Sequence, residues 1–260
     1  MRVTIDDHPF RKKLLYDFHM VWQEHPDEAM FDNSRILNNY ETYIHNSSRS
    51  LNELCSWITK LHFSLERLNK YRKSQSIHDV KALIHDLENH YIRLYSLLDR
   101  LYQFLNDSLN LGFKANHVSE KYILENVKFL IHPQLVSVVK DVRKSLAEYR
   151  VIRNGLVHRE QIKDKDLLDL QAYCSDIFTN GDIWERLNPG KNHSDFVQYK
   201  IHTFQTVAGK KHDELLELIE VLEVSLTQIL DVMYAIYNRQ KQIELASLSI
   251  DSTQNSPPSK

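Results

Sequence analysis

The sequence predicts an all-α protein, an up-down helical bundle of long antiparallel helices with an N-terminal helical extension. Glycine and proline are scarce, with 5 and 6 in 260 residues, whereas strand-rich folds need turn residues at short intervals. Apolar residues also recur every three or four positions over long stretches, which is typical of amphipathic helices. No Gly-, Pro- or Ser-rich linker divides the chain. We therefore expect one bundle with its extension.

Residues 1–72 are expected to form the N-terminal helical extension, packed on the bundle. Pro9 suits the first turn of a helix. The helix over 10–23 is expected to end before Pro26, because proline disfavours helical geometry in the residue before it. The segment 34–72 contains no Gly or Pro and predicts a long amphipathic helix. Its apolar stripe consists of Leu51, Leu54, Ile58, Leu61, Leu65 and Leu68.

The bundle is expected to occupy residues 73–246. The short polar connection 73–76 predicts a helical hairpin, with Ser76 as a candidate N-cap of its second helix. Gly112 is expected to end that helix, and a short helix is expected from Ser119. The stripe of the second helix is wide enough for a bundle core. It consists of Ile77, Val80, Ile84, Leu87, Tyr91, Leu94, Leu98, Leu101 and Leu105.

A third helix is expected to begin after Pro133 and to run into residues 153–158. Its inward stripe consists of Leu135, Val139, Val142, Leu146 and Tyr149. A fourth helix, capped by Asp164 or Asp166, is expected to stop before Asn180, because Asn-Gly pairs are typical of turns.

The C-terminal part is expected to contain two helices. Residues 179–193 form the longest irregular stretch, and a helix over about 195–207 follows. Gly209 is expected to separate it from a final helix, because glycine disfavours helix interiors. The stripe of that helix consists of Leu215, Leu218, Leu222, Ile229, Val232, Ile236 and Ile243. Residues 247–260 are expected to be a disordered tail.

Composition restricts the location and the partners. A formal net charge of -2 gives no global attraction to nucleic acid, so RNA binding would need a local basic patch. Cys55 and Cys174 lie in apolar contexts without metal-binding spacing, which predicts buried thiols in a reducing cytoplasm. Residues 1–15 are charged, and no later segment approaches about 18 uncharged apolar residues. We expect no export signal, no membrane span and a cytoplasmic location.

The end of the third helix combines charge with imidazole. Continuing its stripe by one turn reaches Arg153, so a permanent charge occupies an inward position. Arg150, Asn154 and His158 align along one side of the same helix at spacings of four. Arg153 and His158 are five residues apart, which is about 140° around an ideal helix. Either a bend at Gly155 or a second copy of the chain is needed to bring them together.

The chemistry that these residue types support is cleavage of a phosphodiester. Histidine moves protons near neutral pH, and arginine offsets charge on phosphoryl oxygens. Segment 140–163 has a local excess of four positive charges. A purely structural interpretation also remains: Arg153 pairs with a buried carboxylate, Gly155 caps the helix, and His158 binds its last carbonyls. The charged residues are Lys140, Arg143, Lys144, Arg150, Arg153, Arg159 and Lys163 against Asp141, Glu148 and Glu160.

The run from Arg153 to His158 resembles the Arg-(four to six residues)-His signature of the HEPN superfamily. The polar Asn154 directly after the arginine belongs to the resemblance, which covers residues 76 to about 246. It implies a homodimer whose facing motifs form one cleft. It also implies metal-independent endoribonuclease activity through attack by the ribose 2′-hydroxyl, often in toxin–antitoxin or antiviral systems.

Carried over by position, the resemblance implies that Arg153 and His158 are catalytic and that Asn154 supports them. No cofactor and no metal are expected, since Glu-x-x-His and His-x-x-x-His pairs are absent from the sequence. The alternative function is a catalytically inactive interaction or regulatory module that binds a protein, such as an antitoxin, or a nucleic acid. The neighbouring cations expected to bind RNA are Arg150, Arg159 and Lys144.

Overall fold

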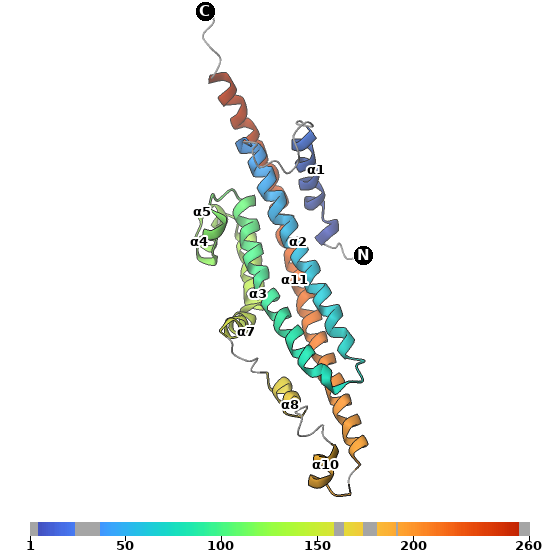
Figure 1. Cartoon of the computed structure of the whole chain (residues 1–260). Coiled ribbons are helices and arrows are strands. Elements are labelled where there is room, and N and C mark those ends of the chain that lie inside the picture. Colours follow the sequence, from blue (N-terminus) through green and yellow to red (C-terminus); the bar gives the residue numbers. More distant parts are fainter. Residues whose placement is uncertain (1–4, 24–36, 159–163, 174–180, 191, 255–260) are drawn as a thin grey trace, which may run out of the picture. The chain divides into compact units, whose positions relative to one another are not determined.

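The computed structural model describes residues 5–23, 37–158, 164–173, 181–190 and 192–254 (Figure 1). It confirms the all-α bundle, since no strand occurs in these ranges. The expected helix end at Pro26, Cys174 and the last six residues lie outside them. The helices are η1 (Ile5–Asp7), α1 (Pro9–Gln23), α2 (Asn39–Tyr71), η2 (Ile77–Asp79), α3 (Val80–Ser108), η3 (Ala115–His117), α4 (Glu120–Leu124), α5 (Val127–Leu130), α6 (Pro133–Ser145), α7 (Ala147–Val157), α8 (Lys165–Tyr173), α10 (Gly181–Leu187) and α11 (His193–Gln254).

Several helices begin where the sequence places their caps. Pro9 is the first residue of α1. The side chains of Ser76, Ser119 and Asp164 each accept a hydrogen bond from a backbone N–H in the turn that follows. Such bonds satisfy donors that the first turn of a helix leaves without a partner. Ser76 caps η2, which leads directly into α3.

The chain folds into two compact units, and α2, α3 and α11 contribute to both. The first unit comprises residues 1–57, 97–144 and 222–260, and the second comprises 58–96 and 145–221. Residue 73, the expected boundary between extension and bundle, lies inside the second unit, and both units contain part of α2.

Aromatic rings form the core of the first unit. Phe10 of α1 lies with its ring centroid 5.3 Å from Tyr237 and 6.1 Å from Phe104. Tyr237 also stacks on Tyr43 of α2, at 5.6 Å. The Tyr43 hydroxyl donates to the backbone oxygen of Ser108 at 2.9 Å. These contacts join α1, α2, α3 and α11 around one apolar centre.

A buried carboxylate fastens α1 to α11 in the same unit. Asp17 is 3% exposed and pairs with Lys13 at 2.9 Å and with Lys241 at 2.8 Å. The Tyr237 hydroxyl donates to its second oxygen at 3.0 Å. The hydrogen bond that Lys13 donates to Asp17 raises the pKa of Lys13. Paired and hydrogen-bonded in this way, the carboxylate is stable without water.

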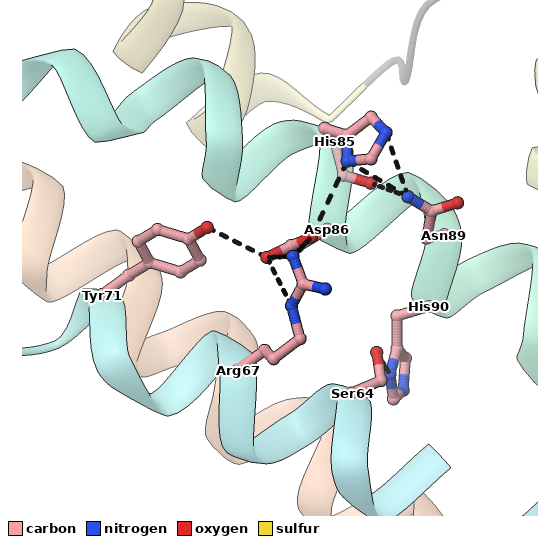
Figure 2. Close-up of polar contacts among 7 residues, drawn as sticks. All are labelled: Ser64, Arg67, Tyr71, His85, Asp86, Asn89 and His90. Atoms are coloured by element: carbon pink, nitrogen blue, oxygen red, sulfur yellow. Dashed lines mark hydrogen bonds and ion pairs between the residues drawn. The ribbon is translucent and has the colours of Figure 1, made fainter. Parts of the chain in front are cut away.

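In the second unit, α2 and α3 run antiparallel, and a cluster of polar side chains connects them (Figure 2). Arg67 of α2 binds both oxygens of Asp86 on α3, with its shortest contact at 2.8 Å. The Tyr71 hydroxyl donates to the same carboxylate at 2.9 Å. An ion pair of 2.8 Å between Arg72, directly after α2, and Asp213 connects α11 to the hairpin. The cluster therefore fixes the hairpin that the sequence predicts.

His90 is a fully buried member of this cluster. Its Nδ1 lies 2.9 Å from the Ser64 hydroxyl, and its Nε2 is buried without a hydrogen-bond partner among the described residues (Figure 2). Burial, and then the charges of Arg93, His212 and His62, lower the pKa of His90 to about 3. The imidazole is therefore neutral at physiological pH.

We expect the free energy of unfolding to fall by about 2 kcal/mol between pH 7 and pH 5 because of His90. The unfolded chain binds a proton below its ordinary pKa of 6.5, whereas the folded chain binds it only near pH 3. The free energy of unfolding is therefore highest above pH 6.5 and decreases as the pH falls. Urea unfolding at several pH values measures this. His90→Gln should flatten the pH dependence, and the same change at exposed His85 should not; equal slopes for both would contradict the prediction.

Gly209 does not interrupt α11, contrary to the expected boundary there. The helix is continuous over 62 residues, from His193 to Gln254. A Cβ at Gly209 would lie 3.4 Å from Nε of Arg72, which pairs with Asp213 one turn later. That distance is an ordinary van der Waals contact, so the arginine does not require a glycine here. Tertiary packing of α11 overrides the helical cost of glycine, about 1 kcal/mol.

Three other boundaries differ from the sequence-based expectation. The third helix is two helices, because Leu146 adopts φ -100° and ψ 4° between α6 and α7. Helix α10 lies within the stretch expected to be irregular, and α11 continues into the segment expected to be a tail, as far as Gln254.

Cys55 is buried, and burial raises the pKa of its thiol to about 11. Within the described ranges, no helix is long and apolar enough to cross a lipid bilayer.

Candidate functional site

Helix α7 carries the candidate site, and Tyr149 fixes its orientation. Tyr149 is the buried residue of α7, and its ring centroid lies 5.5 Å from that of Tyr91 on α3. A buried aromatic ring contributes a large apolar contact area. Arg153 follows Tyr149 by one turn and is half-buried. The inward position expected for the arginine is thus an edge position.

Arg153 lies over an aromatic ring. Its guanidinium carbon is 5.6 Å from the ring centroid of Tyr95 on α3, within the range of a cation–π contact. Its Nη1 donates to Oδ1 of Asn154 at 3.4 Å. No carboxylate of the described residues pairs with it, and its buried Nε has no hydrogen-bond partner there. The structural interpretation of Arg153 as one half of a buried ion pair is not supported in this part of the chain.

His158 ends the helix and is exposed. Its backbone N–H donates to the carbonyl oxygen of Asn154 at 3.1 Å, and the α-helix passes through Gly155 to Val157. Gly155 therefore lies within the α-helix and does not cap it. The offset of about 140° between Arg153 and His158 is retained within one copy. The imidazole has no hydrogen-bond partner among the residues that the structure describes.

Apolar side chains surround the exposed polar ones. Val151 is 73% exposed and Val157 is 58% exposed. Arg150, Asn154 and His158 are exposed on the same outward side of α7. The two valines therefore border the polar face of α7 on either side.

The three residues expected to bind RNA have different positions. Arg150 is exposed on α7, one turn before Asn154. Lys144 is exposed near the end of α6 and belongs to the first unit, so it gives no evidence of a patch shared with α7. Arg159 lies outside the described residues. Only Arg150 is therefore placed with the motif.

Tyr95 is the member of the site that the sequence did not indicate. The contact joins residues 58 positions apart in the chain, and Tyr95 reads in the sequence as a flank of the α3 stripe. One signal was present: Tyr91 and Tyr95 are separated by one turn, as are their partners Tyr149 and Arg153. Neither spacing alone identifies the pairing.

The described ranges hold no group of three or more His, Cys, Asp or Glu side chains that could bind a metal ion.

Comparison with known protein families identifies a relationship for most of the chain. A family model described as Cthe2314-like HEPN matches residues 43–238, which include α7 and most of α2. The match begins well before residue 73, where the sequence placed the start of the bundle. No curated protein matches the chain, and no solved structure does.

Proposed function

The chain belongs to the Cthe2314-like HEPN family, and from this membership and the geometry of α7 we propose that it is a metal-independent endoribonuclease acting as a homodimer. The observation that carries the proposal is the exposed face of α7. It presents Asn154 and His158 to solvent beside an Arg153 whose charge no described carboxylate neutralises.

In the proposed reaction, His158 removes the proton of a ribose 2′-hydroxyl or protonates the leaving 5′-oxygen. The 2′-oxygen forms a bond to phosphorus while the bond from phosphorus to the 5′-oxygen breaks. Arg153 stabilises the charge on the equatorial oxygens of the phosphorane. Asn154 orients Arg153 through the hydrogen bond to its Nη1. The products are a 2′,3′-cyclic phosphate and a 5′-hydroxyl.

A second copy of the chain is part of this proposal for two reasons. An ideal helix directs Arg153 and His158 about 140° apart, and α7 continues as an α-helix through Gly155 to Val157. The exposed Val151 and Val157 also supply apolar area that a partner would cover. In a two-fold symmetric dimer, the arginine of one copy can face the histidine of the other. A role in toxin–antitoxin or antiviral defence belongs to the same proposal.

The test incubates the wild type with a mixed RNA pool in excess EDTA and identifies the new RNA ends. The double variant Arg153→Ala/His158→Ala, purified in parallel, controls for contaminating nucleases. We expect 2′,3′-cyclic phosphate ends from the wild type alone. Equal cleavage by both proteins, or an inactive wild type, would contradict the proposal and favour the inactive interaction module.

A further inference from the structure

Helices α3 and α7 of the second unit contact each other through one aromatic pair and one cation–π pair. Tyr91 packs on Tyr149 with ring centroids 5.5 Å apart and 40° between the ring planes. Tyr95 lies under Arg153, with 5.6 Å from the ring centroid to the guanidinium carbon. On each helix the two members are four residues apart, so both pairs occupy consecutive turns. The register of one pair determines the register of the other.

The first pair is an anchor. Tyr91 is 5% exposed and Tyr149 is 9% exposed, and burial raises the pKa of both hydroxyl groups well above their usual range. Two buried rings restrict the rotation of α7 about its own axis. Arg153, one turn later, is consequently held against Tyr95.

The contact between Tyr95 and Arg153 leaves only part of the guanidinium available to bind a ligand. Nε of Arg153 is buried, without a partner among the described residues, and Nη1 donates to Asn154. The side chain makes no described ion pair that would fix its direction. The aromatic face of Tyr95 therefore restrains the planar group together with the hydrogen bond to Asn154, and Nη2 of Arg153 remains to bind an anion.

We propose that Tyr95 is a positioning residue, which holds the Arg153 guanidinium in the orientation that meets a phosphoryl oxygen of RNA. This inference rests on the proposed function, because it concerns the reaction at the same site. A ring restrains a cation through its face and not through its hydroxyl. The Tyr95 hydroxyl is therefore dispensable, whereas the ring is required.

The experiment compares kcat and KM for RNA cleavage by Tyr95→Phe, Tyr95→Leu and Tyr71→Leu. Tyr71 is the matched control, since it is a partly buried tyrosine of the same unit whose described contacts are with α3 and α11. We expect Tyr95→Leu to lower kcat by about ten- to a hundredfold, because a misplaced group loses transition-state stabilisation, with little change in KM. Tyr95→Phe should retain wild-type kcat within about twofold. Tyr71→Leu should lower the melting temperature while keeping kcat.

Two outcomes would overturn the inference: Tyr95→Phe as impaired as Tyr95→Leu, or a kcat loss in Tyr71→Leu equal to that in Tyr95→Leu. Melting temperatures of all variants show whether a loss of kcat only reflects unfolding.

A double-mutant cycle separates this inference from the proposed function. The unfolding equilibria of Tyr95→Leu, Arg153→Ala and their combination report the coupling of the two side chains without any RNA. We expect a coupling of about two- to thirtyfold in the unfolding constant. Cleavage by the wild type without coupling would refute the role of Tyr95 alone. An inactive wild type with coupling would refute the nuclease proposal, and the role of Tyr95 in cleavage with it.

Discussion

An equimolar mixture of Arg153→Ala and His158→Ala chains is expected to recover about one quarter of wild-type RNA cleavage, if each site combines the two copies of a symmetric dimer. Each variant alone is expected to lose about a hundredfold to ten-thousandfold in kcat. The recovery follows from the geometry of α7, whose helical course through Gly155 keeps Arg153 and His158 on different sides of one copy. Random mixing makes half of the dimers mixed. Each mixed dimer has one of its two combined sites intact.

The control mixture combines the wild type with the double variant Arg153→Ala/His158→Ala. Its mixed dimers hold no complete site shared between copies, so only the wild-type dimers, about one quarter of the population, should cleave. A site contained within one copy would instead give about one half in this control and no recovery in the first mixture. Initial rates after exchange of subunits, with light scattering to verify dimers, distinguish the two arrangements.

Asp17→Ala is expected to lower the free energy of unfolding by about 3 to 5 kcal/mol. The substitution removes the shared partner of Lys13, Lys241 and the Tyr237 hydroxyl. Lys241 is 15% exposed and keeps a largely buried charge without its carboxylate. Burial, and then Asp17, raise the pKa of Tyr237, so its hydroxyl stays protonated and needs an acceptor. Urea denaturation measures the loss.

The matched control is Asp7→Ala, which removes another lysine partner near α1. Lys12 and Asp7 are 3.4 Å apart, and both side chains are largely exposed. Exposed ion pairs contribute about 0 to 1 kcal/mol, so this variant should be nearly as stable as the wild type. Similar losses in both variants would show that Asp17 does not fasten α1 to α11. Amide hydrogen exchange in α1 locates the loosened region.

The sequence was sufficient to predict the helical class and several helix starts. Capping acts within one turn, so Ser76, Ser119 and Asp164 predict their helices without knowledge of the rest of the chain. Gly209 shows where such local signals fail. Glycine disfavours helix interiors, yet α11 continues through Gly209, beside which lies Arg72 from a distant part of the sequence. Leu146 continues the apolar spacing, so periodicity alone does not reveal the break between α6 and α7.

The sequence predicted which residues form the candidate site but not which residues they contact. The order of Arg153, Asn154 and His158 is visible in the sequence, and so is their separation on a helix. The support under Arg153 is not visible, because stripe counting assigns Tyr95 to the flank of a core and cannot identify which residue covers its ring. The partial exposure of Arg153 likewise depends on where α7 meets α3.

Helix α7 is short, with 11 residues. Helices shorter than about 12 to 15 residues are marginal in water, so most of the helicity of α7 comes from packing. Arg153, Asn154 and His158 are therefore displayed by a segment whose secondary structure depends on its neighbour. We expect substitutions of the α3 residues in contact with α7 to alter the local folding of α7 and the proposed reaction together.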